Sequence, residues 1–205
     1  QKFSIQLPAD FRISLNVSPL HFEEPENFVK KICELIRTYQ VDTSRLTFEI
    51  TESTYVNNTE AVNCVIRGLK QHNIQISMDD FGSGYSSLNA LKDLLFNEVK
   101  IDRKFLGDSL TENAKIVLQE VFHMLKRMGK SIVCEGVETE DIAEFLKEEG
   151  CDEIQGFLYY RPMCEEDFEK LRIETLLSGE YDSCNAIVTL HAGAGGTDSC
   201  DWANM

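Results

Sequence analysis

Short apolar runs alternate with amphipathic segments along most of the chain. The runs have the length and composition of buried strands, and the segments between them carry apolar residues three or four positions apart, as helices do. Strands are predicted over residues 12–18, 45–51, 74–80, 97–102, 131–136 and 153–160. Helices are predicted over residues 25–40, 59–69, 86–94, 112–128, 139–150 and 164–177.

Strand–helix units of this kind predict an α/β fold with parallel strands and crossover helices. A barrel and an open doubly wound sheet both fit the pattern, and polar residues at the strand ends separate them. An open sheet gathers ligand groups between two strands, whereas a barrel gathers them from every strand at one mouth. All six strands carry such residues, which favours the barrel: Asn16, Glu49, Glu52, Asp79, Asp80, Lys100, Asp102, Glu135, Glu138 and Gln155.

Composition narrows the class of protein. The 205 residues are 42% hydrophobic and 27% charged, a globular profile, and the net charge is −15. An acidic chain of this kind argues against a surface that coats nucleic acid, since phosphate backbones attract clustered lysine and arginine. No apolar stretch reaches the ~20 residues that a bilayer requires, and the first residues do not resemble a signal peptide. The seven cysteines are odd in number and contain no CxxC, so we expect reduced thiols in a cytoplasmic protein rather than a zinc site.

Each polar strand end has a structural explanation when taken alone, as a satisfied core group, a helix cap or a turn. Together they predict several carboxylates in one mouth, which repel one another unless a cation compensates them. Oxygen ligands without histidine or cysteine indicate Mg²⁺ or Mn²⁺, and less strongly Ca²⁺. The adjacent Asp79 and Asp80 precede a glycine turn that could aim both carboxylates at a pair of metals, which can activate water and hold a phosphodiester. Lys100 could orient the water, and Glu135 and Glu138 are further acid–base or ligand candidates.

The motifs "SLNVSPLHF", "LTFEITES", "MDDFGSGYSSL", "VKIDRKFL", "CEGVET" and "IQGFLYYRPM" together resemble the EAL domain, the bacterial cyclic-di-GMP phosphodiesterase, over roughly residues 3–171. The resemblance implies a (β/α)₈ TIM-type barrel that linearises cyclic-di-GMP to pGpG with Mg²⁺ or Mn²⁺. It implies metal ligands at Asn16, Glu49 and Asp79, with Asp80 on the second metal. Lys100 and Glu135 match residues that handle the attacking water. Further matches are Glu52, which steadies the loop from residue 81 to 86, and Asp102, Glu138 and Gln155, which line the site.

One expected element is missing. The sequence contains no Glu-Ala-Leu tripeptide, whose glutamate is a metal ligand in the family. The chain begins just before "ISLNVS", so we expect a barrel that lacks its first two strands together with that glutamate and a nearby substrate-contacting arginine. An open barrel would expose strand edges and apolar core, which favours self-association and makes a homodimer a candidate assembly.

The last thirty residues differ from the rest. Residues 176–205, "LLSGEYDSCNAIVTLHAGAGGTDSCDWANM", resemble a stretch of bacterial peptide chain release factor 2 without its Gly-Gly-Gln motif. We therefore expect a truncated EAL phosphodiesterase domain over residues 1–171, and a release-factor-2-like fragment over 172–205 that is not an independent domain.

Three hypotheses follow for function. The first is metal-dependent hydrolysis of cyclic-di-GMP, supported by the set of motif residues. The second is a catalytically impaired EAL domain that binds cyclic-di-GMP or regulates, supported by the missing ligand. The third is an inert fragment of the parent enzyme. The expected partner is cyclic-di-GMP, with no nucleic acid polymer and no membrane segment, and a stability shift on adding cyclic-di-GMP would separate the second hypothesis from the third.

Overall fold

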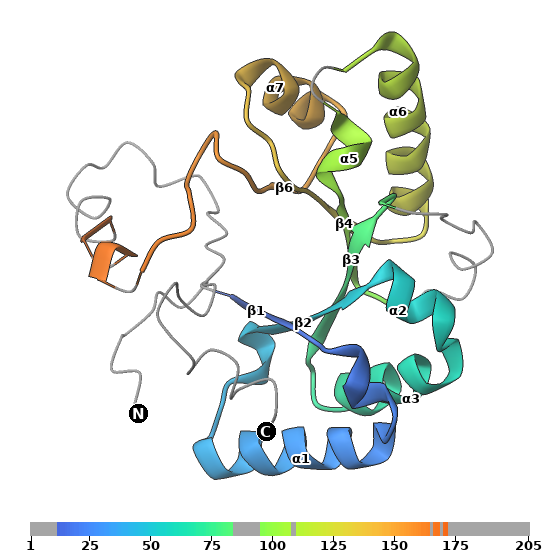
Figure 1. Cartoon of the computed structure of the whole chain (residues 1–205), viewed down its shortest axis with the longest axis vertical. Coiled ribbons are helices and arrows are strands. Elements are labelled where there is room, and N and C mark those ends of the chain that lie inside the picture. Colours follow the sequence, from blue (N-terminus) through green and yellow to red (C-terminus); the bar gives the residue numbers. More distant parts are fainter. Residues whose placement is uncertain (1–11, 84–94, 108–109, 165, 169, 172–205) are drawn as a thin grey trace.

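Six parallel strands form one curved sheet in the computed structural model, which describes residues 12–83, 95–107, 110–164, 166–168 and 170–171. The strands lie side by side in sequence order, and the sheet bends into an arc with the helices along its outer side (Figure 1). This is a half-barrel of the α/β class. Its strands are β1 (Ile13–Asn16), β2 (Leu46–Thr51), β3 (Gln75–Phe81), β4 (Glu98–Ile101), β5 (Ser131–Cys134) and β6 (Glu153–Ile154).

Some of the connecting helices begin with a side-chain cap or with proline. The Thr51 hydroxyl accepts from the Thr54 amide, and the Thr111 hydroxyl accepts from the Ala114 amide, so each satisfies a free donor of a first turn. The described helices are η1 (Pro19–Phe22), α1 (Pro25–Tyr39), η2 (Thr43–Arg45), α2 (Glu52–Asn57), α3 (Thr59–Lys70), α5 (Arg103–Leu106), α6 (Glu112–Arg127) and α7 (Glu140–Glu148). No helix among the described residues is long and apolar enough to cross a membrane.

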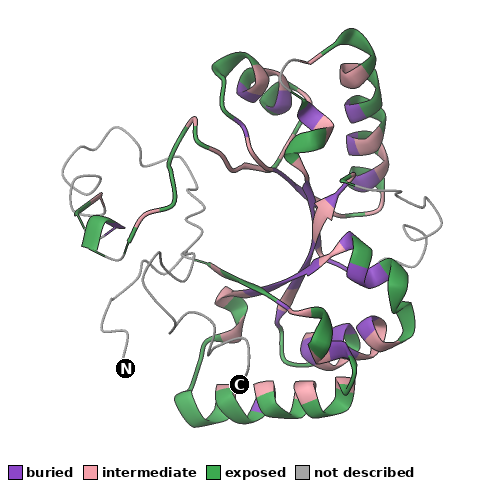
Figure 2. Cartoon of the chain, in the orientation of Figure 1, coloured by how far each residue is buried: buried purple, intermediate pink, exposed green. Residues whose placement is uncertain are grey.

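The hydrophobic core lies between the outer face of the sheet and the helices. Side chains alternate between the two faces of a strand, so one set of alternate residues faces the helices. Figure 2 shows the central strands of the arc mainly in purple, the colour of buried residues. The positions that face the helices are almost entirely buried and belong to one apolar cluster: Phe48, Ile50, Ile76, Met78, Val99, Ile101, Ile132 and Cys134. Burial of these side chains drives the helices onto the sheet.

The inner face carries polar residues at the intervening positions. Thr47, Glu49, Ser77, Glu98 and Lys100 are each at most 8% exposed. Buried charges need partners, so the inner face must pair its own groups. Strand β1 departs from this pattern, because three of its four residues are exposed.

Several predicted boundaries are wrong in an informative way. The strand predicted over 153–160 ends at Ile154, because the chain turns at Gly156. A Cβ on Gly156 would lie 2.0 Å from the Val137 carbonyl oxygen, and Leu158 donates a backbone hydrogen bond to that oxygen. The short helices α2 and α5 were not predicted. The helix predicted over 86–94 lies outside the described residues. Of the helix predicted over 164–177, residue 164 is not helical, residues 166–168 and 170–171 are helical, and the others lie outside the described residues.

Candidate active site

A buried lysine surrounded by three carboxylates lies at the end of the inner face. The Lys100 ammonium nitrogen lies 2.9 Å from Glu49 Oε1, 3.1 Å from Asp79 Oδ1 and 2.6 Å from Glu135 Oε1. These four residues come from β2, β3, β4 and the position that follows β5. The structure therefore brings together four of the site residues expected from sequence, from four consecutive strands.

The carboxylates hold Lys100 in its charged form. Burial alone would lower the pKa of this ammonium group, but attraction by Glu135, Glu49 and Asp79 outweighs it and raises the pKa above its usual value. One positive charge among three carboxylates leaves the cluster with an excess of negative charge. Such an excess in a buried site favours the entry of a further cation.

Asp79 and Asp80 lie on the same side of the sheet although they are neighbours in sequence. The pairing of β3 with β4 shifts between Met78 and Phe81, and Asp80 has a left-handed backbone conformation with φ of 57°. This bulge breaks the strict alternation of a strand and redirects the second carboxylate. As a result, ligand oxygens of Asp79, Asp80 and Glu135 all lie within 4.8 Å of one another.

Two members of this group bind protons more tightly than ordinary carboxylates. Burial raises the pKa of Glu135, although Lys100 opposes the shift, and the nearby Asp79 raises it further. Burial also raises the pKa of Asp80, and Asp79 and Asp102 add to the effect. The site thus contains clustered carboxylates whose negative charge Lys100 compensates only in part.

Glu52 supports the turn that follows β3. Its carboxylate accepts a hydrogen bond of 3.1 Å from the Gly82 amide, and Glu52 is only 5% exposed. Gly82 has a φ of 89°, and a Cβ there would lie 2.2 Å from the Phe105 ring. Only glycine fits at this position, so the turn after the two aspartates is held by α2 on one side and by α5 on the other.

The remaining predicted site residues lie around the cluster. Asn16 is opposite Glu49 in the β1–β2 register and is exposed. Asp102 caps α5 by accepting from the Lys104 amide at 2.7 Å. Gln155 is held by its backbone, which donates to the Cys134 carbonyl and accepts from the Val137 amide. The structure does not bring Glu138 into contact with Lys100: Glu138 is exposed and pairs with Arg103 at 2.7 Å.

A second polar layer beneath this site was not predicted from sequence. Glu98 precedes Lys100 by two positions and is 8% exposed, and burial raises the pKa of its carboxyl. Arg12 lies 3.8 Å from Glu98 and also pairs with Glu153. The strand pattern already indicated that Glu98 shares the inner face with Lys100, because residues two positions apart on a strand lie on the same face.

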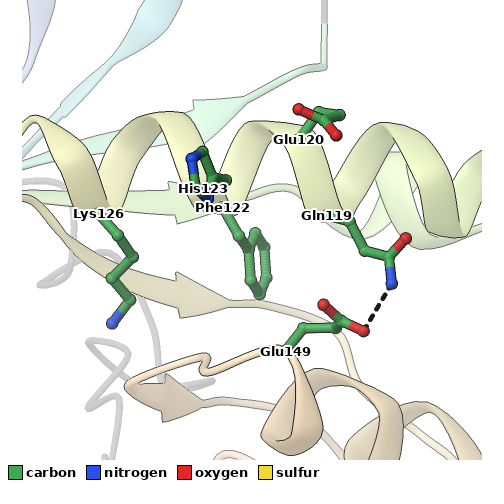
Figure 3. Close-up of a pocket in the computed structure, with 6 residues that line it drawn as sticks. All are labelled: Gln119, Glu120, Phe122, His123, Lys126 and Glu149. Atoms are coloured by element: carbon green, nitrogen blue, oxygen red, sulfur yellow. Dashed lines mark hydrogen bonds between the residues drawn. The ribbon is translucent and has the colours of Figure 1, made fainter.

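A hollow of about 460 Å³ between α6 and the end of α7 contains none of these residues (Figure 3). It is lined by Gln119, Glu120, Phe122, His123, Lys126 and Glu149, and Gln119 donates a hydrogen bond of 2.7 Å to Glu149 across it. Its walls belong to the outer helices, so this hollow and the carboxylate cluster lie on opposite sides of the sheet.

Known proteins share both the sequence pattern and the half-barrel. The model of the EAL domain matches residues 1–162. The cyclic di-GMP phosphodiesterase PA2567 of Pseudomonas aeruginosa is 35% identical over 159 residues, which are 77% of this chain and 27% of that protein. The bifunctional diguanylate cyclase/cyclic di-GMP phosphodiesterase MucR of the same organism is 38% identical over 156 residues, which are 76% of this chain and 23% of that protein. The chain thus spans about a quarter of the length of these curated relatives.

Solved structures agree with this pattern. The phosphodiesterase PaMucR in its c-di-GMP complex superposes with a TM-score of 0.71 and 36% identity, over 78% of this chain and 65% of that chain. The EAL domain of Mycobacterium smegmatis DcpA superposes with a TM-score of 0.72 and 32% identity, over 80% of this chain and 73% of that chain. With the family model matched over most of its length, this chain belongs to the EAL domain family.

Proposed function

We propose that this chain hydrolyses cyclic-di-GMP to pGpG with the help of Mg²⁺ or Mn²⁺. The observation that carries the proposal is the cluster in which the buried Lys100 contacts the buried Glu49 and the half-buried Asp79 and Glu135 at the ends of four strands. Relatives named as cyclic di-GMP phosphodiesterases and a neighbour solved with c-di-GMP support the choice of substrate. We further propose that the half-barrel is part of an eight-stranded TIM-type barrel.

The residues present fit a pair of divalent cations. Asp79 Oδ1 is buried and accepts no hydrogen bond of good geometry from the described part of the chain, even though Lys100 lies 3.1 Å away. The neighbouring ligand atoms of Asp80 and Glu135 are also carboxylate oxygens, which Mg²⁺ and Mn²⁺ prefer as ligands. In the proposal Asp79, Asp80, Glu49 and Asn16 hold the metals. When bound, divalent cations would acidify water and neutralise charge on the phosphodiester.

Lys100 and Glu135 would handle the proton of the attacking water. Their side chains are 2.6 Å apart, and the raised pKa of Glu135 brings its carboxylate nearer to the basicity that a proton acceptor needs. Lys100 stays charged and would donate hydrogen bonds to oxygen atoms that gain negative charge during attack. Glu52 would act indirectly, as a positioning residue that fixes the turn at Gly82 after the two aspartates.

Substrate contacts are assigned to the rim of the site. Asp102, Glu138 and Gln155 follow β4, β5 and β6, and so lie at the same end of the sheet as the cluster. Cyclic-di-GMP carries two phosphodiester charges, and the cluster is itself acidic. Bound cations would therefore be needed to attract the substrate as well as to activate water.

The wider assignments are also proposals. Residues 1–171 would form the phosphodiesterase domain, and residues 172–205 would be a release-factor-2-like appendage. We place the activity in the cytoplasm and propose that the chain associates as a homodimer.

The test is product analysis of the purified chain. Incubation with cyclic-di-GMP and Mg²⁺ or Mn²⁺ should yield pGpG by chromatography. Glu135→Ala should yield none, while Glu148→Ala, an exposed glutamate on α7, should match the wild type. The alternative of an impaired binding module predicts no pGpG but a higher melting temperature with cyclic-di-GMP, since a ligand stabilises the state that it binds. A folded sample that shows neither effect would contradict both.

A further inference from the structure

The short helix α5 touches both turns that carry carboxylates of the proposed site. It follows β4, the strand of Lys100, and β4 lies between β3 and β5 in the sheet. Phe105 packs on Gly82 in the turn after β3, and Arg103 packs on Gly136 in the turn after β5. A Cβ at Gly136 would lie 2.6 Å from the Arg103 Cβ, so the arginine stem rests directly on the backbone. One short helix thus contacts the turns on both sides of the lysine.

Gly136 allows this close approach. Its φ is 66°, in the left-handed region that glycine adopts without the steric cost other residues meet. It directly follows Glu135, whose amide donates a hydrogen bond of 3.0 Å to the Ile101 carbonyl at the end of β4. The contact between Arg103 and Gly136 therefore lies one residue from the carboxylate that approaches Lys100.

The guanidinium of Arg103 holds the far end of the same segment. Its Nη1 donates a hydrogen bond of 2.7 Å to Glu138 Oε1. Between these two contacts lies Val137, which is fully buried and whose amide donates to the Gln155 carbonyl at 3.2 Å. The arginine side chain therefore spans residues 136–138 from the α5 side, while the backbone of the segment pairs with the chain after β6.

The exposure of the ion pair indicates what it can contribute. The side chains of Arg103 and Glu138 are 54% and 42% exposed, and an ion pair in such a position adds little to global stability. Geometry is a different matter, because displacement of a catalytic group by a fraction of an ångström already slows a reaction. The Glu135 carboxylate lies 2.6 Å from the Lys100 nitrogen, so a small shift of its segment would disturb the cluster.

We propose that Arg103 is a positioning residue for Glu135: its stem and its guanidinium fix residues 135–138 against α5, so that the Glu135 carboxylate stays beside Lys100. Arg103 acts through Gly136 and Glu138. Its effect on hydrolysis rests on the proposed function, whereas its effect on the segment does not. Two measurements therefore test the two effects separately.

Hydrogen–deuterium exchange of the whole chain, followed by mass spectrometry, tests the positioning without substrate. Arg103→Ala should speed the exchange of the Glu135 and Val137 amides about threefold or more, since both donate hydrogen bonds from this segment. Arg103→Lys keeps a stem and a positive charge and should exchange as the wild type does. Arg127→Ala, at an exposed arginine that ends α6, is the matched control and should also leave the segment unchanged.

The exchange of β2 separates positioning from general stability. Peptides from β2 should exchange equally in all these variants. Unchanged exchange over residues 135–138 in Arg103→Ala would overturn the proposal, and so would an equal acceleration in β2.

Glu138 provides an internal check on the link. Arg103→Met keeps the stem but loses the charge, and Glu138→Gln breaks the same ion pair from the other side. Each should speed exchange over residues 135–138 by a similar factor, and the double variant should add little, because the two side chains act as a unit. Fully additive acceleration would show that the ion pair does not hold the segment.

Hydrolysis of cyclic-di-GMP tests the consequence for the site. Arg103→Ala should lower kcat about tenfold and leave KM within about twofold, because the variant displaces a catalytic group rather than a substrate contact. Arg103→Lys should retain most of the wild-type kcat. A raised KM with an unchanged kcat would make Arg103 a substrate contact and overturn the positioning role. If the wild-type chain itself fails to hydrolyse cyclic-di-GMP, the proposed function fails, while the exchange experiment still decides whether Arg103 fixes the segment.

Discussion

The two faces of the sheet follow opposite rules although they are made from the same strands. On the outer face Phe48, Ile50 and Met78 are buried in one apolar cluster. On the inner face Glu49 and Lys100 are equally buried but pair with charges. Apolar burial is favourable without partners, whereas buried charge is tolerated only when it is compensated. The outer face therefore holds the fold together, and the inner face carries the proposed site at a cost in stability.

The largest effect is expected from removing the positive charge of the inner face. Lys100→Met should destabilise the fold by about 3–5 kcal/mol, because three carboxylates would lose their shared partner. Hydrolysis should be lost as well. The raised pKa of Lys100 means that its stabilising contribution is complete below the usual lysine pKa, and thus at neutral pH. Urea denaturation measures the loss, with the exposed Lys147→Met as control. Equal midpoints for the two variants would show that the ion cluster is not coupled to folding.

A cavity in the outer face should cost nearly as much stability but spare the chemistry. Ile50 is fully buried under the helices, so Ile50→Ala should cost about 2–5 kcal/mol. Below its unfolding transition, hydrolysis per folded molecule should stay near the wild-type rate. The exposed Val56→Ala is the matched control, with a change of about 0.5 kcal/mol or less. A rate that falls with Ile50→Ala in fully folded protein would mean that the two faces are not separable.

Substitutions at Asp80 can separate the effect of its backbone conformation on stability from the effect of its carboxylate on hydrolysis. Asp80→Gly and Asp80→Ala both remove a proposed ligand and should both impair hydrolysis. Because Asp80 has a φ of 57°, the glycine variant should be more stable than the alanine variant by about 1 kcal/mol. Thermal unfolding of the pair measures this difference. If alanine is as stable as glycine, the left-handed conformation of Asp80 does not persist in solution.

The smallest effect concerns the lower polar layer. Burial raises the pKa of Glu98, so its ionisation costs stability as pH rises from the usual glutamate value through the raised one. Glu98→Gln removes this cost and should raise the free energy of unfolding at neutral pH by about 1 kcal/mol. This corresponds to a rise in the melting temperature of about 2–4 °C. The gain should shrink at acidic pH, where Glu98 is protonated anyway. A gain that grows on acidification would contradict the sign of this shift.

The sequence predicted the parallel α/β arrangement and most of the cluster for one physical reason. Strand ends of a parallel sheet meet at one edge, so Glu49, Asp79, Lys100 and Glu135 could be grouped before any contact was known. The bulge at Asp80 could not be read from sequence, because a left-handed residue within a strand depends on the pairing partner. The apolar run after Ile154 looked like strand, but the close approach of Gly156 to Val137 turns it. Glu98 was missed because its partners are far from it in sequence: Arg12 precedes β1, and Glu153 lies on β6.

The most direct test of the central claim is Mn²⁺ binding to the inner face, followed by the loss of the free-ion electron paramagnetic resonance signal. The intact chain should bind Mn²⁺, and Asp79→Ala and Glu135→Ala should bind far less, while the exposed Glu148→Ala should bind as the wild type does. Equal binding by all four proteins would place the metal elsewhere on this acidic chain and contradict the assignment of the cluster.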